Sequence, residues 1–198
     1  MTDATTAAVR ERVLAAARAC IAAQGLRRTT VDDIAAAAGI SRATLYRAFP
    51  GGRDTILAAL LEGERADLLA SIGVALAEAG GLREELALGL CAAARWLTDN
   101  ALLQRLMFEE PATVLTHVEF EQMDRTLEVA TDAVGPLLER HLEPEAARRA
   151  GEWVTRIVLS FLLFPTDGVD LCDPASVEVL VDRHVLPGVL ALAEDVRH

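Results

Sequence analysis

Apolar side chains recur every three or four residues along most of this chain, the spacing that places them on one face of a helix. In residues 7–24 this face comprises Val9, Val13, Leu14, Ala17, Cys20 and Ile21. We find no convincing alternation of the kind typical of a strand. The pattern therefore predicts an all-α fold of about nine helices, at 7–24, 31–38, 42–49, 53–80, 82–98, 101–110, 112–142, 145–164 and 174–194.

Capping residues mark two short helices near the N-terminus. Thr30 is a suitable N-cap, and Asp33 three residues later gives a capping-box-like start. Gly39 breaks this helix, Ser41 caps the next, and Pro50-Gly51-Gly52 ends it. Two short helices across a four-residue turn with glycine predict a helix-turn-helix, whose second helix lies in the DNA major groove.

The predicted 53–80 helix is long enough to join two domains, about 40 Å at 1.5 Å per residue. We expect a three-helix N-terminal domain at 1–53 and a second helical domain at 54–198. Gly135-Pro136 and Pro187 are expected to kink the helices that contain them.

The net charge of −11 is distributed unevenly. Residues 1–55 carry eight arginines and five acidic residues, a net charge of +3, which leaves −14 for the remainder. A basic N-terminal segment followed by an acidic remainder fits a protein that contacts phosphate through its N-terminal part only.

Three isolated cysteines, without a Cys-x-x-Cys pair, suit a reducing compartment. The N-terminus lacks the layout of a signal peptide. The longest apolar run, from Ile157 to Pro165, is less than half the roughly 20 residues that span a bilayer. We expect a cytoplasmic protein without a membrane partner.

Helix geometry turns one face of the second short helix outward, with Leu45 and Phe49 inward. Arg42 can pair with guanine, and Ala43 or the Thr44 methyl can meet a thymine methyl. Hydroxyl and guanidinium groups nearby can bind phosphate. The candidate DNA-binding residues are Thr30, Ser41, Arg42, Ala43, Thr44, Tyr46, Arg47 and Arg53.

A plain helical hairpin with solvated arginines is the alternative for this segment. The glycine turn, double capping, basic excess and exposed tyrosine occur together, which favours DNA binding.

The first 60 or so residues also resemble the DNA-binding domain of TetR-type repressors. The resemblance is carried by Thr30–Ala38, Gly39-Ile40-Ser41 and the run Thr44-Leu45-Tyr46-Arg47-x-Phe49-Pro50. It implies an all-helical homodimer, one head per half-site of a palindromic operator, and a ligand cavity in each body. Residues 54–198 would then form the effector-binding and dimerisation domain.

The chain departs from that family at two places. Ala48 stands where the family usually has His or Tyr. Gly51-Gly52-Arg53 replaces a loop one residue shorter and the lysine that follows it. Arg53 is a plausible substitute for that lysine.

The body offers candidates for both implied roles, although ordinary core packing also explains each of them. The last two helices carry broad apolar faces, and the resemblance places the dimer interface there, at Val154, Ile157, Phe161, Val177, Val181 and Val185. Large adaptable side chains suit an apolar effector pocket. The effector-binding candidates are Trp96, Met107, Phe108, His117, Phe120, Met123 and Trp153.

Together these features predict a ligand-responsive transcriptional regulator, a repressor released from its operator by a small, largely apolar molecule. A DNA-binding regulator without an effector is the alternative, and a small helical enzyme a remote one. Known catalytic motifs are absent, and His117 and Glu119 do not share a helical face. We expect no catalytic residue, cofactor or metal site.

Overall fold

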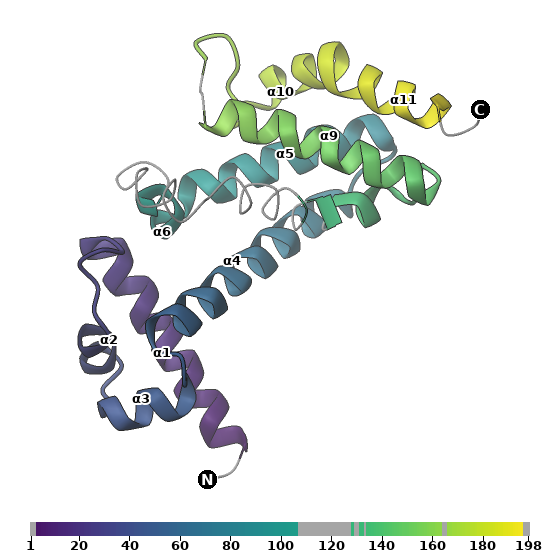
Figure 1. Ribbon diagram of the computed structural model, residues 1–198. Helices are drawn as coiled ribbons and strands as arrows, with labels where there is room; N and C mark the ends of the chain where they lie inside the picture. Colours follow the sequence, from purple (N-terminus) through teal and green to yellow (C-terminus); the bar gives the residue numbers. More distant parts are fainter. Residues whose placement is uncertain (1–2, 107–127, 129–130, 133, 164–165, 196–198) are drawn as a thin grey trace. The chain divides into compact units, whose positions relative to one another are not determined.

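The computed structural model describes residues 3–106, 128, 131–132, 134–163 and 166–195. This part of the chain is built from helices and contains no strand, only a single bridge between Thr166 and Val169 (Figure 1). The all-α prediction is confirmed. The predicted helix at 112–142 and the end of that at 101–110 lie largely outside the described residues.

The chain forms two compact units, residues 1–67 with 98–117 and residues 68–97 with 118–198. The first unit contains α1 (Asp3–Gln24), α2 (Val31–Ala37), α3 (Arg42–Ala48), most of α4 (Arg53–Leu76) and α6 (Ala101–Gln104). Helices α2 and α3 both pack against α1. The observed bounds follow the predicted ones closely, because the capping residues define the ends.

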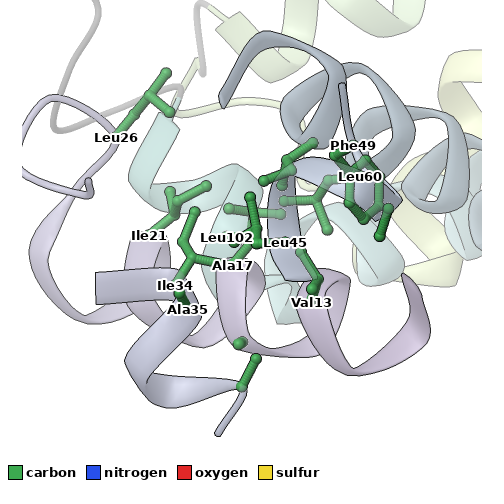
Figure 2. Close-up of a cluster of buried hydrophobic side chains, with 14 of the residues drawn as sticks. Val13, Ala17, Ile21, Leu26, Ile34, Ala35, Leu45, Phe49, Leu60 and Leu102 are labelled. Carbon is green, nitrogen blue, oxygen red and sulfur yellow. The ribbon is translucent and has the colours of Figure 1, made fainter. Parts of the chain in front are cut away.

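A single apolar cluster holds the first unit together. Val13, Ala17 and Ile21 of α1 meet Ile34 of α2 and Leu45 of α3. Figure 2 shows Phe49, Leu60 and Leu102 in the same cluster. Because Leu60 follows the expected boundary at residue 53 and Leu102 comes from α6, this unit extends past that boundary.

The second unit contains α5 (Leu82–Asp99), α9 (Pro144–Leu163), α10 (Pro174–Leu180) and α11 (Leu186–Asp195). Its core includes four side chains without exposed surface, Val177, Val181, Val185 and Val189. Helix α9 packs along α11. A close crossing brings Gly151 of α9 against Gly135, where a Cβ at Gly151 would lie 2.9 Å from the Gly135 nitrogen.

The last predicted helix is interrupted. Between α10 and α11 lies a π-helical turn, Val181–Val185, in which the Leu186 N–H donates to the carbonyl of Val181. Pro187 follows at once; proline has no N–H and its ring crowds the carbonyl four residues earlier. The wider turn fits this constraint, so the irregularity expected at Pro187 takes the form of a π-helical turn.

Candidate nucleic-acid interface

The start of α2 is fixed by a complete capping box. The Thr30 hydroxyl accepts from the Asp33 N–H at 3.1 Å, and the Asp33 carboxylate accepts from the Thr30 N–H at 2.9 Å. The same carboxylate accepts from the Thr30 hydroxyl at 2.6 Å, and these hydrogen bonds hold the pKa of Asp33 below its ordinary value. Both capping residues are exposed, but the Thr30 hydroxyl already donates its single proton to Asp33, so the predicted phosphate contact would require that bond to break.

The turn between α2 and α3 has the geometry that the sequence predicts. Gly39 adopts φ +63°, a conformation that side chains disfavour. Ser41 then caps α3 by accepting from the Thr44 N–H at 3.2 Å. The Arg12 guanidinium donates to the carbonyls of Ala38 and Gly39 and ties the turn to α1.

Helix α3 separates its inner and outer residues as expected. Leu45 is fully buried and Phe49 is 1% exposed, which anchors the helix in the core. Arg42, Ala43, Tyr46 and Arg47 are exposed, and Thr44 is half-buried. Four of the five predicted α3 residues therefore form one accessible face.

Two of these side chains are held by neighbours. Arg42 forms an ion pair with Asp32 of α2, with Nη1 3.2 Å from either carboxylate oxygen, and its guanidinium carbon lies 5.8 Å from the centre of the Tyr46 ring. Arg47 donates to the Thr44 hydroxyl at 3.1 Å.

The two-glycine loop after α3 supports Tyr46. Gly52 adopts φ +61°, and a Cβ there would lie 2.9 Å from Cε1 of Tyr46. The longer loop therefore packs its backbone against the tyrosine ring. The sequence reveals the unusual loop but not its contact with Tyr46.

Two arginines of the first unit donate hydrogen bonds to backbone carbonyls at or near the ends of helices in the same unit. Arg10 donates to Ala48 at 2.6 Å and lies 4.2 Å from the Phe49 ring centre, while Arg53 donates to Leu26. A cation at a helix C-terminus interacts favourably with the helix dipole. The structure thus gives Arg53 an intrachain role beside the predicted phosphate contact.

Ala48 is 7% exposed, and its carbonyl accepts the Arg10 bond. Its methyl group therefore belongs to the core of the first unit. Ala48 therefore presents no polar side chain at the position where the resembling family usually has His or Tyr.

The effector candidates fall mostly outside the described residues; this holds for Met107, Phe108, His117, Phe120 and Met123. Trp96 is half-buried on α5. Trp153 is 40% exposed on α9, and its indole lies against Gly188 of α11. An open groove of about 560 Å³ lies between α5 and the start of α10, and neither tryptophan lines it.

The dimer candidates divide into two groups. Val177, Val181 and Val185 have no exposed surface within the single chain, so their side chains cannot contact a second copy. They serve the intrachain core instead. Ile157 and Phe161 are half-buried on α9, and Val154 is 5% exposed. The apolar side chains that remain exposed nearby are Trp153, Val179 and Leu190.

Among the described residues, no group of three or more His, Cys, Asp or Glu side chains is placed to hold a metal ion. The helices of the same residues include none that is long and apolar enough to cross a membrane.

Comparison with known proteins identifies the same segment. Residues 13–60 match the family described as bacterial regulatory proteins, tetR family. An uncharacterised HTH-type transcriptional regulator of Mycobacterium tuberculosis H37Rv is 36% identical over 103 residues, which are 52% of each chain. The chain thus spans about half the length of that curated relative. A second such regulator from the same strain is 27% identical over 183 residues, 89% of this chain and 83% of the relative.

The fold has a known counterpart over nearly its whole length. The TetR family repressor AlkX from Dietzia sp. strain DQ12-45-1b, implicated in biodegradation of n-alkanes, is similar with a TM-score of 0.65. The two chains are 24% identical, and the match covers 92% of this chain and 95% of AlkX. Both M. tuberculosis relatives are transcriptional regulators, in agreement with the expectation of a non-enzymatic protein. The helix-turn-helix of this chain lies inside the segment that matches the tetR family of bacterial regulatory proteins.

Proposed function

We propose that this protein is a homodimeric transcriptional regulator that binds a palindromic DNA operator through α3 and is released from it by a small, largely apolar molecule. The observation that carries the proposal is the accessible face of α3, where Arg42, Ala43, Tyr46 and Arg47 stand outward on a helix anchored by Leu45 and Phe49.

The chemistry of this face suits a major groove. A guanidinium can donate two hydrogen bonds to guanine, and a methyl group can contact thymine, as Arg42 and Ala43 would do. Tyr46 and Arg47 can donate to phosphate oxygens, which fix the position of the helix on the duplex. Ser41 is exposed at the start of α3 and can add such a contact.

A second copy is needed to read a palindrome. Trp153 of α9 and Leu190 of α11 are 40% and 47% exposed, on two helices that pack along each other. Large exposed apolar side chains on adjacent helices are typical of an interface. We place the dimer interface on the outer surfaces of α9 and α11, with Ile157 and Phe161 of α9.

Buried polar atoms support a ligand in the second unit. The hydroxyls of Thr131 and Thr155 are buried, and neither has a hydrogen-bond partner among the described residues. Each is four residues in sequence from a glycine of the Gly135–Gly151 crossing. Because buried hydroxyls usually have partners, these two can supply the polar contacts of a largely apolar effector.

Release from the operator would follow from a change in the separation of the two DNA-binding units of the dimer. Residues of α4 belong to both compact units, so an effector that displaces this helix alters the separation of the two α3 helices in the dimer. Recognition helices must match the roughly 34 Å repeat of the duplex. A small displacement is therefore costly.

The test is a selection of bound sequences from random duplex DNA, with the full chain and with the double variant Arg42→Ala/Tyr46→Ala. An enriched palindrome that the double variant loses supports the proposal. Absence of enrichment from a folded dimer contradicts it. Operator affinity that is unchanged by every molecule that binds the second unit would favour a regulator without an effector.

A further inference from the structure

An acidic residue lies beside the residue best placed to read a base. Asp32 is in the first turn of α2, and Arg42 is the first residue of α3. Their side chains are joined across the turn by the 3.2 Å ion pair, although they are 65% and 62% exposed. A carboxylate on a surface that faces phosphates weakens DNA binding, so its presence here calls for a function.

We propose that Asp32 is a positioning residue for sequence recognition, holding the Arg42 guanidinium beside the Tyr46 ring in the orientation that meets a guanine. The inference rests on the proposed function and deepens it. It gives Asp32 a second effect, repulsion of phosphate, which lowers affinity for DNA of any sequence.

The ion pair with Asp32 leaves two of the three guanidinium nitrogens of Arg42 uninvolved. The ion pair uses Nη1 alone. A guanidinium presents five N–H donors in a planar fork, so Nη2 and Nε can still donate together to O6 and N7 of guanine. Asp32 therefore restrains Arg42 without occupying the atoms that a base needs.

Restraint matters because arginine is a flexible side chain. Ordering a rotamer-rich side chain on binding costs affinity, and a side chain held in place beforehand avoids part of that cost. Asp32 on one side and the Tyr46 ring on the other reduce the orientations open to Arg42. The gain is confined to the one base pair that Arg42 reads.

The two effects of Asp32 have opposite signs, which separates this role from a structural one. Loss of the carboxylate should weaken the preference for one base pair and strengthen binding to unrelated DNA. A residue that only stabilised the start of α2 through the helix dipole would, when replaced, weaken all DNA binding together.

The experiment measures operator and non-operator affinity of the full chain, with the selected palindrome and a scrambled duplex at fixed salt. The variants are Asp32→Asn, Arg42→Ala and their combination. Glu11→Gln is the control, since Glu11 is an exposed carboxylate of α1 that forms no ion pair with a described residue. Selection with Arg42→Ala first identifies the base pair that Arg42 reads.

For Asp32→Asn we expect the ratio of operator to scrambled affinity to fall about twofold to fivefold, the range of an exposed ion pair. The selected preference should relax at the Arg42 base pair alone, and affinity for scrambled DNA should rise. Adding Asp32→Asn to Arg42→Ala should change the preference no further. Glu11→Gln should leave it unchanged.

Two results overturn the role of Asp32. One is an unaltered preference at the Arg42 base pair in Asp32→Asn; the other is an equal loss at every position of the palindrome. If the unmodified chain enriches no sequence, the proposed function itself fails, and the role of Asp32 fails with it.

Discussion

The Glu64 carboxylate of α4, only 3% exposed, lies 2.8 Å from the Arg18 guanidinium of α1. It also accepts a 2.6 Å hydrogen bond from the side chain of Asn100, the N-cap of α6. One buried carboxylate therefore joins three helices of the first unit.

Replacement of Arg18 by alanine should destabilise the first unit, because it removes the cation facing a buried charge. We expect the free energy of unfolding to fall by about 1–3 kcal/mol, measured by urea denaturation. Arg65→Ala is the control, since it breaks an exposed Arg65–Glu62 pair and should cost less than about 0.5 kcal/mol. Equal losses in the two variants would contradict the buried role of Glu64.

The capping box should make stability depend on pH. The bonds from Thr30 lower the pKa of Asp33 from its ordinary value of 3.8, so the unfolded chain binds its proton more readily than the folded one. The stabilisation is therefore present at neutral pH and is lost as the pH falls through the lowered pKa.

Asp33→Asn should accordingly lose less stability than the unmodified chain between about pH 5 and pH 2, as followed by thermal unfolding. Parallel profiles for Asp33→Asn and the unmodified chain would show that the capping carboxylate does not contribute.

Gly52→Ala should impair DNA binding through Tyr46. The positive φ costs about 1 kcal/mol for a residue with a Cβ, and the added carbon would press on the tyrosine ring. We expect operator affinity, measured by fluorescence anisotropy, to fall about tenfold. Gly73→Ala is the contrasting variant: it lies within α4 with open space around it and should stabilise by about 0.5–1 kcal/mol. Undiminished operator binding by a folded Gly52→Ala protein would argue against support of Tyr46 by the loop.

Leu190→Glu should weaken the dimer. A carboxylate in an apolar interface loses its hydration without gaining a partner, so sedimentation velocity should show a shift toward monomer at micromolar concentration. Val74→Glu tests specificity, since Val74 is 76% exposed on α4, outside the proposed interface. A dimer lost in both variants, or in neither, would place the interface elsewhere.

Local signals in the sequence were enough to predict the helix-turn-helix. Thr30, Gly39 and Ser41 act on their immediate neighbours, and the structure confirms the two predicted N-caps and the glycine turn between them. The inward anchors Leu45 and Phe49 follow from helix periodicity alone.

Partners distant in sequence could not be predicted in the same way. Arg53 binds the Leu26 carbonyl and Arg10 that of Ala48, and a long arginine side chain can reach many acceptors. Leu102 returns to the first core after the whole of α5, which periodicity does not reveal. The sequence pattern of an apolar face, such as that of Val177 and Val181, also does not indicate whether the face packs against its own chain or against a second copy.

The π-helical turn before Pro187 has a consequence for the spacing of the buried valines. Val177, Val181, Val185 and Val189 lie four residues apart, whereas an α-helix needs 3.6 residues for each turn. In a regular helix each step would rotate the valine stripe by about 40°, carrying Val189 toward solvent. The wider turn absorbs one residue and brings the stripe back into line, which agrees with the complete burial of all four side chains. Deletion of one residue from this turn would therefore restore a regular α-helix and keep the buried positions of α11 facing the core.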